Sequence, residues 1–189
     1  MRTKSFLQFA AILFSGILSV TSAAAATNDV RINVMITGKE IALPPDRRST
    51  LVSNVVSFVH SASVNLTQWS ANQEAGEKEW ERLMKSDSFI HITFTKPATI
   101  SLMRADNQGR EEKTVSQILV TLPVNRWPWV CVKSDGAVIG LTKYNPLALK
   151  VLVAEPALGL SSVPPYDSLI KHAEKRQGRQ TESRQTGDR

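Results

Sequence analysis

The first strand that the sequence predicts is marked by a regular alternation of apolar and polar residues. From Val30 to Ile36, every second residue is a β-branched apolar residue, and a period of two is typical of a half-buried strand. Gly38 permits a turn after it, and residues 41–43 are expected to form a short second piece. Pro44 should end this piece, because proline cannot donate to a sheet.

Two later stretches carry apolar residues at spacings of three and four, which is the pattern of one helix face. The first predicts a helix over residues 50–61, with its N-cap among residues 46–49. The second predicts a helix over residues 74–85, with acidic residues in its first turn and basic residues in its last. That charge order suits the helix dipole.

The segment from Ser88 to Lys143 consists of short β-rich runs separated by turn residues, as in an antiparallel meander. Lys96-Pro97 is expected to turn the chain, and residues 104–113 are expected to form a charged loop. Asp135-Gly136 predicts a tight hairpin, because a type I′ turn needs a positive φ at both central residues. The predicted β-rich runs cover residues 88–94, 99–104, 114–123, 127–133 and 137–142.

After the meander, Asn145-Pro146 has the residues of an N-cap and of a first helical position. The helix that should follow, over residues 147–154, is apolar nearly all round except at Lys150, and we expect it to be buried. A short amphipathic helix is expected from Asp167 through Ala173. Residues 177–189 contain no apolar residue, so this polar and basic tail is expected to be disordered.

The order of these elements predicts an α+β fold with an antiparallel β-meander sheet and helices packed on one face. Residues 27–176 are expected to form a single domain. A sequence of 189 residues is long enough for one such domain with a real core.

Residues 1–26 have the features of a secretory signal peptide. Arg2 and Lys4 form a basic start, Phe6 to Val20 is apolar, and small residues follow up to Ala26. The alternative is a membrane anchor, but the apolar run is short for a span. We therefore expect a periplasmic or extracellular protein that has no transmembrane segment after cleavage.

The formal net charge of +6 is concentrated at the two ends of the chain. The C-terminal residues from Lys171 carry a clear excess of cations, including Arg176, Arg179 and Arg184, while the body is nearly neutral. The sequence therefore does not favour a nucleic-acid-binding face on the folded domain. The tail arginines are candidates for electrostatic contact with an acidic surface, and a plain solubilising tail is the alternative.

Catalytic and metal-binding patterns are weak. His60, His91 and His172 lack the spacing of metal ligands, so we expect no metal and no cofactor. Cys131 lies in an apolar run and is expected to be a buried, inert thiol, with an intermolecular disulfide as the alternative. Ser168 and Lys171 match the S-x-x-K pattern of penicillin-recognising enzymes, but the accompanying motifs are missing and we attribute the match to chance.

Trp127 and Trp129 are the most suggestive pair, since both lie on one face if residues 127–133 form a strand. They are candidates for a binding face, with core packing as the alternative. His91 is a further binding candidate on the sheet. Asn65-Leu66-Thr67 is a glycosylation sequon, whose use depends on the source.

These patterns together favour a secreted or periplasmic, non-catalytic protein that binds a protein or a cell-envelope component. One alternative is a small-ligand or glycan-binding domain that uses Trp127 and Trp129. Another is a hydrolase whose site is assembled from residues distant in the sequence.

Overall fold

The structure is a computed structural model that describes residues 29–65, 72–106, 108–122 and 128–160, together with Ser168 and Lys171. Within this part of the chain, strands precede and separate three α-helices, the last of which follows the last strand, and this gives an α+β fold. In chain order the elements are β1 Val30–Ile36, β2 Lys39–Glu40, α1 Pro45–His60, β3 Ser63–Asn65, α3 Gln73–Met84, β4 Phe89–Met103, β5 Arg110–Thr121, β6 Val130–Ser134, β7 Ala137–Thr142, α4 Pro146–Val153 and the 3-10 turn η2 Pro156–Leu158.

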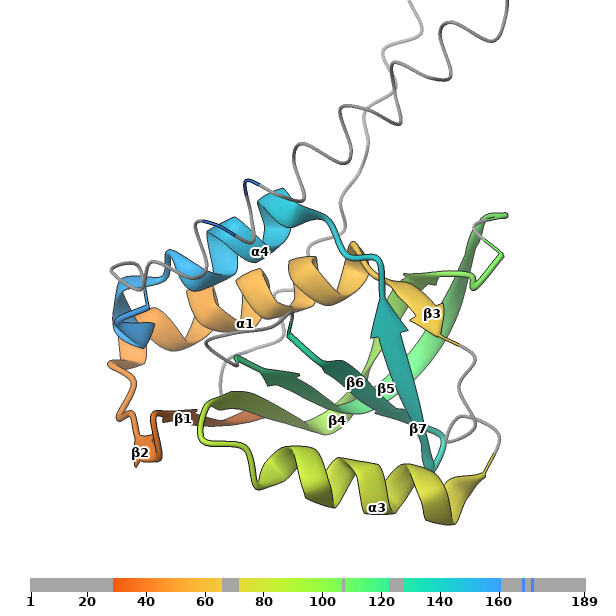
Figure 1. Ribbon diagram of the computed structural model, residues 1–189, viewed down its shortest axis with the longest axis horizontal. Helices are drawn as coiled ribbons and strands as arrows, with labels where there is room; N and C mark the ends of the chain where they lie inside the picture. The colour runs from red at the N-terminus through yellow and green to blue at the C-terminus, as the bar shows by residue number, and fades with distance from the viewer. Residues whose placement is uncertain are drawn as a thin grey trace, which may run out of the picture.

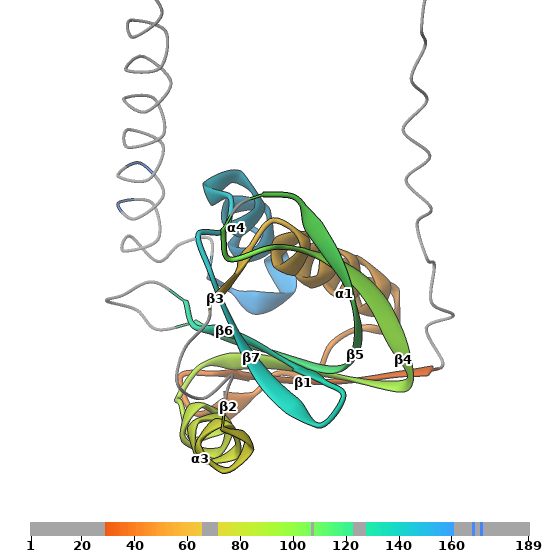
Figure 2. The same cartoon turned by 90° about the vertical axis from the view of Figure 1, so that its right-hand side faces the viewer.

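The strands form a seven-stranded sheet in the order β2-β1-β4-β3-β7-β6-β5, and β5 pairs back onto β4. This pairing closes a ring of β4, β3, β7, β6 and β5, with β1 and β2 attached outside β4 (Figure 2). The pairing is antiparallel except between β3 and β4, which are joined in parallel at Ser63 and Met103. The predicted α+β class with a mostly antiparallel sheet is thus confirmed, but the sheet is not a simple meander, since β1 lies beside β4 and β3 lies between β4 and β7.

The predicted turn at Lys96-Pro97 is wrong, because β4 runs through it as one long strand. The pairing with β5 shifts register between Thr93 and Ala98, so Pro97 lies at an irregularity where its missing N–H is tolerated. Such an irregularity also lets a strand bend. The long strands β4 and β5 accordingly curve up beside α1 (Figure 2).

One predicted turn is present, one predicted loop is shorter than expected, and one short strand is displaced. Asp135 and Gly136 have φ angles of 50° and 78°, and they join β6 to β7 as the predicted hairpin. The charged loop is shorter than predicted, because β5 already begins at Arg110. The second short strand, β2, lies just before residues 41–43 rather than on them.

The expectation that all helices pack on one face of the sheet is wrong. The helices α1 and α4 lie side by side on one side, and α3 covers the opposite side (Figure 1). Each side has its own apolar cluster. Strand residues alternate between the two faces, and Phe89, Leu119 and Cys131 supply an apolar surface on the side where α3 packs.

The larger cluster fills the space between the sheet and the helices α1 and α4. We call these two helices the helical layer. Its buried residues from α1 are Leu51, Val55, Phe58 and Val59, and those from α4 are Leu149, Leu152 and Val153. The smaller cluster joins Trp80 and Leu83 of α3 to the sheet.

The three helices predicted within residues 50–154 are present, although the first starts earlier than predicted. The helix α1 begins at Pro45, earlier than predicted, and its N-cap residue Pro44 makes no side-chain hydrogen bond. Proline is favoured at a first helical position because its φ is already helical. The helix α3 begins and ends one residue before the predicted range, and Asn72 Oδ1 accepts a hydrogen bond from the Ala75 N–H at its start.

Several expectations fall on residues outside the described ranges. These are the signal peptide over residues 1–26, the tail over residues 177–189 and most of the predicted helix after Asp167, of which Ser168 and Lys171 are described as helical. No helix among the described residues is long and apolar enough to cross a membrane.

Candidate functional site

The start of α4 is fixed by the residues that the sequence indicated. Asn145 Oδ1 accepts a hydrogen bond from the Leu147 N–H at 2.8 Å, and Pro146 occupies the first helical position. The Asn145 N–H in turn donates to Ser61 Oγ at 3.1 Å. The N-terminus of α4 is therefore attached to the residue that follows α1.

Further contacts hold α4 against the rest of the fold. The Tyr144 ring lies 4.8 Å from the ring of Phe58 on α1, measured between ring centroids. The Tyr144 hydroxyl donates a hydrogen bond to the Pro128 carbonyl, and burial raises the pKa of Tyr144. At the other end, Arg47 of α1 lies 4.0 Å from the buried carboxylate of Glu155. These contacts set which side of α4 faces outward.

One side of α4 is apolar yet exposed. Leu147, Lys150, Val151 and Ala154 are all exposed and follow the spacing i, i+3, i+4, i+7, so they form one stripe that we call the outer face of α4. Leu147 is 57% exposed and Val151 is 56% exposed, and they are the two exposed large hydrophobic residues of the described chain. The prediction that this helix is buried is therefore correct for its inner side and wrong for its outer side.

The sequence did not predict that this face is exposed, because a helix that is apolar nearly all round is normally expected to be buried. The available signal was Leu147 and Val151, two aliphatic residues one turn apart beside Lys150. A helix that packs in a single layer on a sheet can bury only one side, so an apolar residue on its other side must be exposed.

The helical layer and the residues next to it carry exposed cations. Lys150 lies within the outer face of α4, Lys143 precedes the helix, and Arg48 lies in the first turn of α1. All three are exposed, and none makes an ion pair with another described residue. We call Arg48, Lys143 and Lys150 the cationic rim. It gives the helical layer an uncompensated positive charge.

The opposite side of the molecule has a different charge arrangement. On α3, Glu74 pairs with Lys78 at 2.7 Å and Glu79 contacts Arg82. The carboxylate of Glu77 lies 2.6 Å from the Lys133 ammonium of β6. Charges on this side are thus largely neutralised in pairs, so the charge differs between the two faces of the fold.

His91, a predicted binding residue, lies on the α3 side of the sheet. Its Nε2 is 3.0 Å from Gln117 Oε1, and its ring meets the Trp80 ring edge-on at 5.7 Å between centroids. Burial lowers the pKa of His91, and nearby Lys133 lowers it further, while the hydrogen bond to Gln117 opposes this shift. The neutral imidazole is therefore held in a hydrogen-bonded and aromatic environment.

Cys131 is fully buried in the smaller cluster, as predicted. Burial raises the pKa of its thiol to about 12, and Glu79 adds to this shift while Arg82 opposes it. Since the thiolate is the nucleophilic form, the thiol is chemically inert near neutral pH. The buried position also excludes the alternative of an intermolecular disulfide in this fold.

The tryptophan pair is only partly described. Trp129 is half-buried and packs against the smaller cluster, and its backbone N–H donates to Thr121 Oγ1 at 3.0 Å. Trp127 lies outside the described residues, as do Arg176, Arg179 and Arg184 of the tail. The structure thus places Trp129 and His91 on the α3 side of the sheet, where they pack with Trp80 and its cluster.

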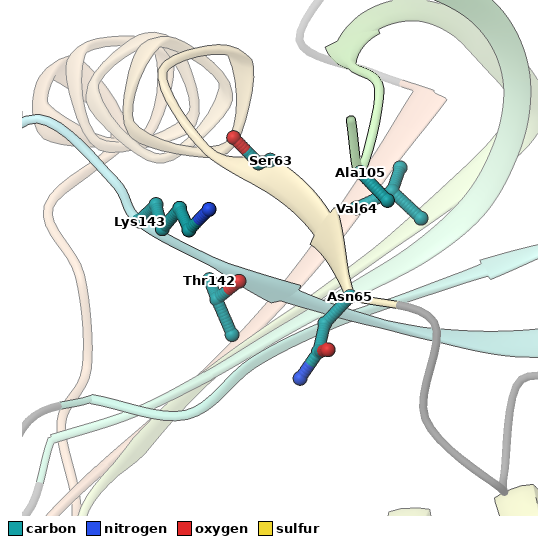
Figure 3. Close-up of a pocket in the computed structure, with 6 residues that line it drawn as sticks. All are labelled: Ser63, Val64, Asn65, Ala105, Thr142 and Lys143. Atoms are coloured by element: carbon teal, nitrogen blue, oxygen red, sulfur yellow. The ribbon is translucent and has the colours of Figure 1, made fainter. Parts of the chain in front are cut away.

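A small hollow lies where β3 joins β7. It has a volume of about 220 Å³ and is lined by Ser63, Val64, Asn65, Ala105, Thr142 and Lys143. Figure 3 shows the Lys143 side chain extending over this junction, with Thr142 and Asn65 beside it. Lys143 has a φ of 53°, which turns the chain from β7 toward α4. Asn65 of the sequon is described here, and the rest of the sequon is outside the described ranges.

Within the described ranges, no group of three or more His, Cys, Asp or Glu residues is arranged to hold a metal ion. No protein-family model, curated protein or solved structure matches this chain.

Proposed function

We propose that the protein is a non-catalytic binding protein of the periplasm or the extracellular space, and that it docks on a component of the cell envelope through the outer face of α4. The observation that carries this proposal is the exposure of Leu147 and Val151 on a helix whose other side is fully packed. Exposed aliphatic side chains on a well-ordered helix gain free energy when a partner covers them, and since Leu147 and Val151 are 57% and 56% exposed, each would gain about half of the 1.5–3 kcal/mol of a fully exposed side chain.

The surroundings of these residues support docking rather than a packing defect. The outer face of α4 is held in place by the Asn145 cap and by the contacts of Tyr144. A partner therefore meets a preformed surface and loses little entropy in ordering it. The cationic rim would add attraction to an acidic partner and speed its approach.

The test is photo-crosslinking from a position within the face. A cysteine introduced by Ala154→Cys takes a thiol-reactive benzophenone, while buried Cys131 does not react. The labelled full chain is irradiated in the envelope fraction of its source, beside a control labelled through Glu81→Cys on α3. We expect adducts from position 154 that are absent from position 81.

The double substitution Leu147→Asp and Val151→Asp should abolish these adducts without unfolding the chain, because both side chains are exposed. Identical adducts from both labelled positions, or none from position 154, would sink the proposal.

A second candidate function, the binding of a small anionic ligand, is favoured by the hollow between β3 and β7. Its lining offers the ammonium of Lys143 and the hydroxyl of Thr142, but its volume is below that of typical ligand pockets. Addition of inorganic phosphate or acetate should then shift the amide NMR signals of β3 and β7. Unchanged signals at millimolar ligand would remove this candidate.

A further inference from the structure

We infer that α3 is an acid-sensitive cover: protonation of His91 frees α3 from the sheet and exposes the apolar residues of the smaller cluster beneath it. The inference is independent of docking through the outer face of α4 and concerns the opposite side of the fold. It is carried by the position of the His91 ring, which contacts the Trp80 ring of α3 and bonds to Gln117 of β5.

The helix α3 is attached to the sheet by few contacts. It lies on its side of the sheet without another described helix beside it (Figure 1), and its buried residues are Gly76, Trp80 and Leu83. The ion pair of Glu77 with Lys133 of β6 adds a charged link. Units with few buried apolar contacts are the ones that open locally while the rest of a fold stays closed. A change at Trp80 therefore affects much of what holds α3.

At neutral pH the His91 ring suits this contact. Gln117 Oε1 lies 3.0 Å from Nε2, so the neutral ring carries its proton on Nε2 and leaves Nδ1 as an acceptor. The His91 ring meets the Trp80 ring at 77° and 5.7 Å between centroids. An uncharged ring can be covered in this way at a much lower cost than a charged one.

The carboxylates of α3 nearest to the sheet are already paired. Glu77 lies 2.6 Å from the Lys133 ammonium, and Glu79 is bound by Arg82. Within the described part of the chain, no carboxylate makes an ion pair with His91. A positive charge on the His91 ring therefore meets the Lys133 ammonium without an anion of its own.

The strands beside His91 add no negative charge. Arg31 of β1, opposite Thr93, is an exposed cation. The other polar side chains around the ring are neutral, and they are Asn33 of β1, Thr93 of β4 and Gln117 of β5.

Asn33 gives the protonated ring a place to turn. It lies directly opposite His91 in the pairing of β1 with β4, and its Oδ1 is buried without a hydrogen-bond partner. Protonation adds an N–H at Nδ1, which can donate to this oxygen while Nε2 keeps its bond to Gln117. The ring then lies across β4 between its two neighbouring strands, and its edge-on contact with Trp80 is lost.

The direction of the pH effect follows from the environment of the ring. Burial lowers the pKa of His91 and Lys133 lowers it further, while the hydrogen bond to Gln117 opposes this shift. An uncovered His91 therefore binds a proton more readily than the covered one. A fall in pH below 6.5 favours the form in which α3 is displaced.

Cys131 serves as the probe of this movement, because it is the one cysteine of the chain and is fully buried in the smaller cluster. The folded full chain is treated with an aromatic dipyridyl disulfide, a reagent that labels thiols in acid as well as at neutral pH. Each labelling rate is divided by the rate of the urea-unfolded chain at the same pH. Val55→Cys on α1, in a Cys131→Ser background, is the control for opening of the larger cluster.

We expect the relative rate at Cys131 to rise about tenfold between about pH 7.5 and about pH 5. His91→Gln should abolish the rise, because glutamine is polar but does not titrate. Asn33→Leu should reduce it, because the second acceptor is removed. The thiol of Val55→Cys should keep the same low relative rate at both pH values.

A flat rate at Cys131, or the same rise in His91→Gln, would overturn the inference. An equal rise for Val55→Cys would overturn it as well, because the whole chain would then open in acid. An undiminished rise in Asn33→Leu would contradict the movement of the ring toward β1.

Discussion

At the scale of single residues, Lys133 connects α3 to the sheet by two contacts. Its ammonium lies 2.6 Å from the Glu77 carboxylate and 4.8 Å from the centroid of the Trp80 ring. The Lys133 side chain is only 18% exposed, so both contacts are partly shielded from water. This residue therefore contributes more to stability than an ordinary surface cation.

We predict that Lys133→Ala lowers the free energy of unfolding by about 1 kcal/mol in urea titrations. The matched control is Lys78→Ala, which removes an ion pair between two largely exposed side chains and should change stability by less than about 0.5 kcal/mol. Equal effects of the two substitutions would show that the Trp80 contact contributes nothing.

We predict that His91 makes the free energy of unfolding depend on pH. Its pKa in the folded chain is below the ordinary value of 6.5, so the unfolded chain binds a proton first as the pH falls. Stability from the neutral imidazole is therefore fully present above pH 6.5 and is lost as the pH drops below that value. Thermal melts of His91→Gln should lose less stability than the native chain between neutral and mildly acidic pH, and parallel losses would contradict this.

At the scale of elements, α4 places the residues that stabilise the fold and the residues of the proposed docking face on opposite sides. Its inner residues Leu149 and Leu152 are fully buried, while Leu147 and Val151 are exposed. We predict that Leu152→Ala lowers the unfolding free energy by about 2–5 kcal/mol. The pair Leu147→Asp and Val151→Asp should change it by less than about 1 kcal/mol, as measured by urea unfolding. A large loss in the double variant would mean that this face packs within the chain.

The elements also show which features a sequence can predict. Local signals sufficed where one short motif determines the structure, as at Asp135-Gly136 and at the Asn145 cap of α4. They failed at Pro97, where pairing with β5 on both sides of the residue, at Thr93 and again from Ala98, keeps β4 one strand across a residue that usually ends strands. They also failed for the placement of α3, because the apolar residues on both sheet faces are distributed over strands far apart in sequence.

The candidate site was harder to predict than the fold. The exposure of Leu147 depends on which side of α4 meets α1 and the sheet, and that side is set by long-range contacts such as Asn145 with Ser61 and Tyr144 with Phe58. The candidates that the sequence favoured, Trp129 and His91, lie on the α3 side of the sheet instead.

At the scale of the whole molecule, the strand ring closes at a narrow junction. Only Ser63 and Met103 pair between β3 and β4, and the Arg110 guanidinium donates hydrogen bonds to the carbonyls of His60 and Ser101 across it. We predict that Arg110→Ala lowers the unfolding free energy by about 1 kcal/mol, measured by urea titration. Arg104→Ala, which removes an exposed pair with Asp106, is the control, and an equal loss there would rule out a special role for the junction.

The proposed docking involves the helical layer and not α3, whose charges are paired locally, and hydrogen exchange tests this most directly. Mass spectrometry would follow the full chain with and without the envelope fraction of its source. We predict that amides of α4 exchange more slowly when the envelope fraction is present, while those of α3 keep their rates. Unchanged exchange in α4, or equal slowing in α3, would contradict docking through Leu147 and Val151.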